Sequence, residues 1–133
     1  MTMLNEIVLK YNINSVTYDL IEKTIPKQPK ENYYGNREYK YKITNLSKSK
    51  LEKRSTQCLF RIMEGNGNAS YFIGVDDNGN ILGISESDIN ESLENLLKII
   101  INIDAKLVKL KLYKLYDKDL YYMFIKIKKD VIY

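Results

Sequence analysis

Apolar residues at helical spacing predict two amphipathic helices in the middle of the chain. The first helix follows Ser47 and Ser49, two plausible N-caps, and is expected to end at Gly65. Its expected apolar face consists of Leu51, Cys58, Leu59, Ile62 and Met63. The second helix begins behind Ser85, with Asp88 three residues later in a capping-box-like arrangement. Its apolar stripe consists of Ile89, Leu93, Leu96, Leu97 and Ile100.

Alternating apolar and polar positions predict strands around these helices. Residues 38–43 have the alternation of a half-buried strand. Residues 69–75 and 80–84 flank the Asp-Asp-Asn-Gly sequence of residues 76–79. Because Asn-Gly between two apolar runs is a strong hairpin signal, we expect a hairpin closed by a type I′ turn.

A second hairpin is expected from residues 106–115 and 120–128, around the turn Asp117-Lys118-Asp119. The predicted fold class is therefore α+β. Its antiparallel or mixed sheet would be built from one strand and two hairpins, with the two main helices on one face.

The first 34 residues are expected to lie outside this domain. Apolar residues between positions 4 and 25 fall partly at helical spacing and predict one or two short helices. Pro26 and Pro29 bracket a polar linker, since proline disfavours helix on its N-terminal side. We therefore divide the chain into a partly helical arm and linker, residues 1–34, and an α+β domain, residues 35–133.

The composition, 44% hydrophobic and 29% charged, is typical of a globular domain. The chain has no histidine, and Cys58 is its only cysteine. Cys/His zinc sites, histidine-based catalysis and an internal disulfide are thereby excluded. No apolar run is long enough to span a bilayer, and the first residues do not look like a secretory signal. We expect a cytoplasmic protein without membrane contact.

Two loops resemble ligand-binding motifs only superficially. Gly65 and Gly67 begin like a phosphate loop, but here a helix precedes them and a strand follows, which reverses the required context. Because no Gly-Lys-Ser/Thr occurs, a self-contained P-loop GTPase is excluded. Asp76 and Asp77 are not followed by the distal glutamate of an EF-hand, so a plain turn is favoured. We expect no cofactor and no metal.

The formal net charge of +4 favours acidic partners such as RNA or the ribosome. Tyrosines alternate with cations over residues 33–42, a pattern able to stack bases and neutralise phosphates, although a tyrosine-rich strand is the more ordinary explanation. Lysines of residues 109–129 would form either a basic sheet face or a plain solvated surface. The candidate RNA contacts are Arg37, Tyr39, Lys40, Lys42, Arg54, Arg61, Lys109 and Lys111.

Several spaced motifs, in order, resemble the segment that precedes the GTPase domain in the eukaryotic GTP-binding protein 1 and 2 family of elongation-factor-like GTPases. These motifs are Gly35-Asn36-x-Glu38-Tyr39-Lys40-x-Lys42, Thr56-Gln57, Arg61, and Glu64-Gly65-x-Gly67-x-Ala69-x-Tyr71-x-Ile73-Gly74-Val75-x-Asp77-x-Gly79 with Gly83. The resemblance continues through Ser92-Leu93, Leu96 and Asp104-Ala105, and covers roughly residues 26–128.

This resemblance implies an accessory domain of a ribosome-associated or RNA-surveillance GTPase. Its implied partners are RNA, the ribosome, or an elongation-factor-like GTPase in cis or in trans. GTP binding is not implied, because in the family a P-loop follows the last strand, whereas this sequence stops at Tyr133.

A weaker resemblance is to the AlbA-like domain of the Schlafen group, some of whose members cleave RNA with clustered carboxylates and a divalent metal. Glu38-Tyr39-Lys40 and Ile73-Gly74-Val75-Asp76-Asp77 match its motifs, and the resemblance implies Glu38 and Asp76 as ligands. The further upstream acid would fall near Tyr33, where Glu31 is the nearest acid.

Three hypotheses follow. The leading one is a non-catalytic binding module that contacts RNA, the ribosome or a GTPase partner. The alternatives are a Schlafen-type metal-dependent ribonuclease or nucleic-acid-binding domain, and a protein-docking module without affinity for RNA.

Overall fold

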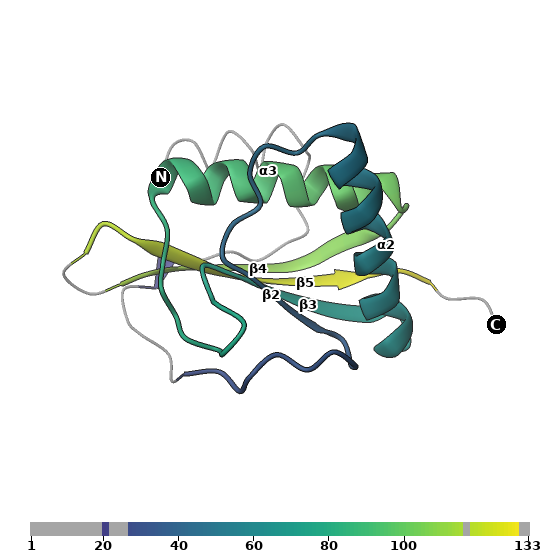
Figure 1. Cartoon of the computed structure of the whole chain (residues 1–133), viewed down its shortest axis with the longest axis horizontal. Coiled ribbons are helices and arrows are strands. Elements are labelled where there is room, and N and C mark those ends of the chain that lie inside the picture. The colour runs from purple at the N-terminus through teal and green to yellow at the C-terminus, as the bar shows by residue number, and fades with distance from the viewer. Residues whose placement is uncertain (1–19, 22–26, 116–117, 131–133) are drawn as a thin grey trace.

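The computed structural model describes residues 20–21, 27–115 and 118–130. Its elements, in chain order, are β1 (Leu20–Ile21), β2 (Arg37–Lys40), α2 (Lys48–Glu64), β3 (Asn68–Ile73), α3 (Glu86–Asn102), β4 (Lys106–Lys114) and β5 (Tyr121–Lys128). Both helices lie over the same face of one sheet (Figure 1), so the predicted α+β class is confirmed.

The sheet is mixed, with the strand order β1-β4-β5-β3-β2. β3 and β4 each pair antiparallel with β5, whereas β2 runs parallel to β3 and the two-residue β1 runs parallel to β4. Because parallel neighbours need a crossover connection, α2 carries the chain from the end of β2 back to the start of β3. This crossover places one face of α2 beside the edge strand β2.

The predicted helix ends are confirmed. Ser47 caps α2 by accepting a hydrogen bond from the Lys50 amide at 3.2 Å, and Gly65 is its C-cap. Ser85 caps α3 in the same way, accepting from the Asp88 amide at 3.1 Å. Because side-chain capping depends on residues that are close in sequence, the sequence was enough to predict where both helices begin.

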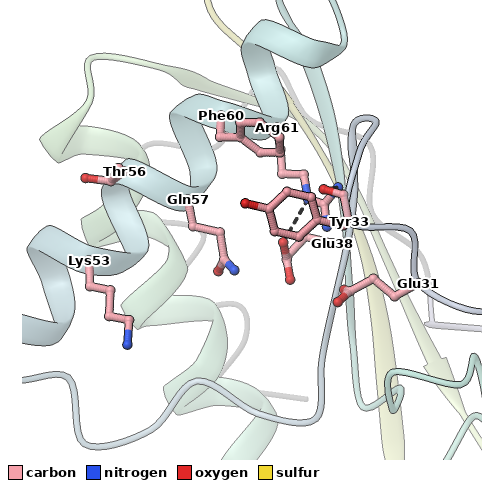
Figure 2. Close-up of a pocket in the computed structure, with 8 residues that line it drawn as sticks. All are labelled: Glu31, Tyr33, Glu38, Lys53, Thr56, Gln57, Phe60 and Arg61. Atoms are coloured by element: carbon pink, nitrogen blue, oxygen red, sulfur yellow. Dashed lines mark hydrogen bonds and ion pairs between the residues drawn. The ribbon is translucent and has the colours of Figure 1, made fainter.

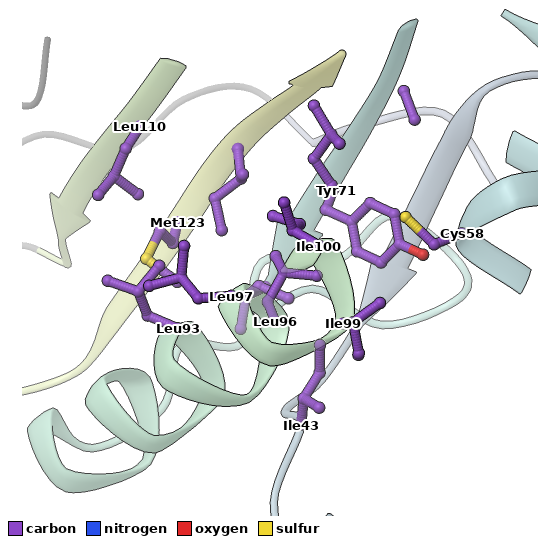
Figure 3. Close-up of a cluster of buried hydrophobic side chains, with 14 of the residues drawn as sticks. Ile43, Cys58, Tyr71, Leu93, Leu96, Leu97, Ile99, Ile100, Leu110 and Met123 are labelled. Carbon is purple, nitrogen blue, oxygen red and sulfur yellow. The ribbon is translucent and has the colours of Figure 1, made fainter. Parts of the chain in front are cut away.

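The main hydrophobic core lies between the two helices and the sheet (Figure 3). All of the apolar stripe predicted for α3 is buried there. The prediction for α2 was partly wrong: Met63 is 50% exposed, whereas Ser55 and Arg61 are buried on the same helix. Arg61 is buried against Glu38 of the edge strand β2, and Ser55 accepts a hydrogen bond from Asn102 at the end of α3.

The first predicted hairpin is confirmed as a reversal of the chain but is reduced to one antiparallel bridge, Val75 to Ile81, whereas the second is confirmed as β4 and β5. β3 takes β2 and β5 as its neighbours, so no place beside it remains for residues 80–84. That segment makes single bridges instead, Val75 to Ile81 and Ile84 to Tyr121. Residue Asp117 of the second turn lies outside the described residues.

The turn at residues 76–79 is also not of type I′. The Gly79 amide donates to the Asp76 carbonyl at 3.0 Å, but among the described residues Asn78 does not have the positive φ that a type I′ turn requires. Gly79 itself has φ 84°, and a Cβ there would come within 2.0 Å of the Gln28 carbonyl oxygen. Glycine is therefore required by its backbone conformation and by the close approach of the preceding linker.

The described part of the N-terminal linker, residues 27–36, runs along the domain as an extended segment. The Gln28 amide donates to the Gly79 carbonyl at 3.0 Å, and the Glu31 amide donates to the Asp77 carbonyl at 2.8 Å. The predicted N-terminal helices fall mostly on residues outside the described part of the chain. No helix among the described residues is long and apolar enough to cross a membrane.

Candidate functional site

A pocket of about 410 Å³ opens between α2 and the segment that leads into β2 (Figure 2). Its volume lies within the range of small-ligand sites. One face of α2 and the residues from 31 to 38 form its walls, and the lining residues are Glu31, Tyr33, Glu38, Lys53, Thr56, Gln57, Phe60 and Arg61. The fold thus brings residues from both sides of the β2–α2 connection to one cavity.

A buried ion pair joins the two walls of this pocket. Arg61 Nε donates to Glu38 Oε1 at 2.9 Å, and both side chains are at most 5% exposed. Arg61 Nη1 also donates to the carbonyls of Tyr33 at 3.1 Å and Gly35 at 2.9 Å. Lys40 lies 3.6 Å from Glu38 Oε2. We call this network the Arg61 clasp, and it ties the linker and β2 to α2.

A second carboxylate, that of Glu31, lies beside Glu38. Glu31 Oε2 accepts a hydrogen bond from the backbone amide of Tyr39. Burial raises the pKa of Glu31, and the neighbouring Glu38 carboxylate raises it further, although the Tyr39 amide acts in the opposite direction. Two carboxyl groups therefore converge, but the Arg61 clasp neutralises one of them.

Aromatic side chains line the mouth of the pocket. Tyr33 is 76% exposed and Phe60 is 37% exposed, with ring centroids 6.0 Å apart. Tyr34, 67% exposed, packs edge-on against Tyr33 at 5.1 Å. These three rings make an exposed apolar rim at the pocket.

On the opposite side of the sheet, five side chains form what we call the lysine face: Lys106, Lys109, Lys111, Lys126 and Lys128. Their strand neighbours, such as Leu110 and Ile125, point into the helix-covered core, so alternation directs the lysines away from the helices. Lys109 lies directly opposite Lys126, and Lys106 opposite Lys128. Within the described residues, none of these lysine side chains takes part in an ion pair.

Aromatic rings continue from the lysine face across the same side of the sheet. Lys111 is paired with Phe124, whose ring lies 5.1 Å from that of Phe72. Arg37 stacks over Phe72 at 4.8 Å and donates to Gln28 Oε1 at 2.6 Å. The face therefore combines a basic half on β4 and β5 with an aromatic half toward β2.

The structure places the RNA contacts expected from the sequence in several different environments. Tyr39 is 2% exposed, its hydroxyl donates to the Pro29 carbonyl, and with the buried Arg61 it is not available to a ligand. Lys40 and Lys42 are engaged in ion pairs, with Glu38 and with Asp88 respectively. Arg54 is half-buried on α2, away from the lysine face that contains Lys109 and Lys111. These eight residues do not form one surface.

The two residues that the Schlafen resemblance implies as metal ligands both have structural partners. Glu38 belongs to the Arg61 clasp. Asp76 accepts hydrogen bonds from the amides of Asn78 and Asn80 and from the Asn80 side chain, which lower its pKa. Among the described residues, no group of three His, Cys, Asp or Glu side chains is placed to hold a metal ion.

Sequence reasoning did not assign the pocket residues Glu31, Lys53, Gln57 and Phe60 to one site. The last three lie on one helix face at positions i, i+4 and i+7, and this spacing is the pattern from which their grouping could have been predicted. Their closeness to Glu31 depends on the linker folding back alongside β2, and no local pattern predicts that.

The fold is that of a small α+β domain with a mixed sheet covered on one face by helices. No protein-family model matches the chain. It is 38% identical to GTP-binding protein 2 of Homo sapiens over 96 residues, which is 71% of this chain and 16% of the human protein. It is also 38% identical to GTP-binding protein 2 of Mus musculus over 86 residues, 65% of this chain and 14% of the mouse protein.

An uncharacterized protein of Acanthamoeba polyphaga mimivirus is 35% identical over 80 residues, 59% of this chain and 43% of the viral protein. The resemblance to the GTP-binding protein 1 and 2 family that the spaced motifs indicated is therefore confirmed as a similarity to part of GTP-binding protein 2. The chain spans about a seventh of the length of those two relatives.

Proposed function

We propose that this chain is a non-catalytic accessory domain of GTP-binding protein type that binds RNA, free or in the ribosome, through the lysine face. The similarity to a short part of GTP-binding protein 2 supports an accessory role, in cis or in trans to an elongation-factor-like GTPase. The observation that carries RNA binding is the set of five lysines without ion-pair partners in the described part of the chain.

Electrostatics favours a polyanion at this face. Like charges directly opposite each other on neighbouring strands repel, and this sheet contains two such pairs, Lys109 with Lys126 and Lys106 with Lys128. Phosphate groups would relieve that repulsion and release condensed counterions on binding. The half-buried Phe124 adjoins the lysines and offers a ring edge for an unstacked base.

The test is a titration of a fluorescent single-stranded RNA at several salt concentrations. The double variant Lys109→Gln with Lys126→Gln should weaken binding at least about tenfold and reduce the slope of log affinity against log salt by about two. The matched control is Lys50→Gln with Lys98→Gln, which removes two exposed lysines from the helices. Equal losses in both variants, or binding independent of salt, would contradict the proposal.

The Schlafen-type ribonuclease is the second candidate, and one observation favours it. Glu31 supplies an upstream acid beside Glu38, at the position that the sequence left open. The same RNA incubated with the protein and Mg²⁺ or Mn²⁺, then analysed on denaturing gels, distinguishes RNA binding from RNA cleavage. RNA retained intact supports binding, metal-dependent shortening supports the nuclease, and absence of both supports docking to a protein partner.

A further inference from the structure

The pocket next to the Arg61 clasp is not explained by RNA binding at the lysine face. The lysine face lies on β4 and β5, whereas the pocket lies at the β2 edge, on the helix side of the sheet. Glu38 is already compensated there by Arg61 and Lys40. The pocket therefore needs an explanation from its own chemistry.

Glu31 is the carboxyl group of this pocket that is not paired with Arg61 and lies beside Glu38. Among the described residues it forms no ion pair, and its hydrogen-bond donor is the backbone amide of Tyr39. Figure 2 shows the Glu31 carboxylate pointing toward the space beside Glu38 and Gln57. A cation entering this space would meet the Glu31 carboxyl group and the side-chain amide of Gln57.

The aromatic mouth favours a flat cation over a compact one. Tyr33 and Phe60 present exposed ring surface at the entrance. A guanidinium group stacks on such rings and can also bind a carboxylate in a planar geometry, whereas an ammonium group does so less well. Arg61 already lies 5.8 Å from the Phe60 ring centroid within the protein itself.

The surroundings of the pocket match a protein partner better than a nucleic acid. Tyr33, Tyr34 and Phe60 form an exposed apolar rim, and aromatic residues are enriched in protein interfaces. The Glu31 carboxylate would repel phosphates. Lys53, exposed at the same pocket, repels a guanidinium group, so the attraction of the Glu31 carboxylate and the aromatic rings has to outweigh it.

We propose that this pocket is a docking site for a single arginine side chain of a partner protein, with Glu31 pairing the guanidinium and Tyr33 and Phe60 stacking on it. The arginine enters between α2 and the linker, and the residues around it in the partner cover the apolar rim. This inference is independent of RNA binding, because the two proposals use different faces of the domain.

The test is a titration of the isotope-labelled full chain with N-acetyl-L-arginine amide. Binding of this probe is measured by NMR chemical shifts. Saturable shifts are expected at Tyr33, Gln57 and Phe60. N-acetyl-L-citrulline amide, which is nearly isosteric but uncharged, should bind at least about tenfold more weakly, because hydrogen bonds between charged groups are the stronger ones. N-acetyl-L-lysine amide should also bind more weakly.

Two variants complete the test. Glu31→Gln keeps an oxygen to accept from the Tyr39 amide while removing the charge, and should weaken the arginine probe about tenfold. Tyr33→Ala should weaken it about threefold, through the loss of cation–π stacking at an exposed position. The matched controls are Glu52→Gln on the exposed surface of α2 and Tyr41→Ala, and neither should change the affinity.

Equal affinity for citrulline or for lysine would overturn the proposal. The proposal would also be overturned if Glu31→Gln bound the arginine probe with unchanged affinity while its unfolding curve matched that of the unmodified protein. Shifts that saturate at other acidic residues, with Tyr33 and Phe60 unaffected, would place arginine binding elsewhere and would equally reject this pocket.

Discussion

The Arg61 clasp and the lysine face use charge in opposite ways. In the clasp, Arg61 and Glu38 are buried, 2.9 Å apart, and the bonds of Arg61 join α2 to β2 and to the linker. On the lysine face, side chains of one sign lie opposite each other and find no ion-pair partner among the described residues. Charge that is compensated inside the protein holds it together, whereas uncompensated charge at the surface is available for binding.

The largest expected effect comes from opening the clasp. Arg61→Ala leaves the Glu38 carboxylate buried with Lys40 as its remaining partner, so the free energy of unfolding should fall by about 3–5 kcal/mol. Chemical denaturation measures this directly. Arg54→Ala, on the same helix but outside the clasp, is the control and should cost less than about 1 kcal/mol. Similar losses in both variants would mean that the clasp is not a special source of stability.

A smaller effect of opposite sign is expected on the lysine face. Lys126→Gln removes the repulsion with Lys109 and should raise the free energy of unfolding by about 0.2–1 kcal/mol at low salt. The gain should shrink in high salt, because exposed charges are screened. Lys98→Gln on α3 should leave stability unchanged. A loss of stability in Lys126→Gln would show that these lysines contribute to folding rather than only to binding.

The smallest effect concerns two carboxyl groups whose pKa values move in opposite directions. The pKa of Glu31 is raised by burial, so its contribution to stability is present at low pH and is lost as the pH rises through its folded-state pKa. The pKa of Asp76 is lowered by hydrogen bonds from Asn80 and Asn78, so its contribution is present above its unfolded pKa and is lost as the pH falls.

Unfolding curves between pH 2.5 and 7 separate the two carboxyl groups. Relative to the unmodified protein, Glu31→Gln should become more stable as the pH rises above the ordinary glutamate value of 4.5. Asp76→Asn should be less stable at neutral pH, with the difference disappearing in acid. Parallel pH profiles for the two variants would contradict the assigned environments.

Local patterns predicted the elements that depend on neighbours in sequence. The two helices, their caps at Ser47 and Ser85, and the β4–β5 hairpin all follow from periodicity and capping within a few residues. The hairpin predicted after β3 is reduced to a single bridge because Asn-Gly marks a reversal of the chain and does not specify which strand lies beside β3. β5 occupies the place beside β3 because it pairs with β3 along the whole of that strand.

The candidate site was harder to predict for the same reason. Arg61 and Lys109 were both chosen from the sequence as RNA contacts, yet one is buried in an ion pair and the other points away from the helices. Residue type alone cannot separate these roles, because a cation has the same sequence signal whether or not an acid lies beside it. Glu31, seven positions before Glu38, becomes its neighbour only when the linker folds back toward α2.

The sequence by itself therefore determined the fold class, the helix boundaries and the similarity to part of GTP-binding protein 2, because periodicity, capping and spaced motifs are local along the chain. The tertiary structure alone decided which strands are parallel, which charges are compensated, and where a pocket opens. These properties depend on contacts between residues far apart in sequence, and such contacts exist only after the chain has packed.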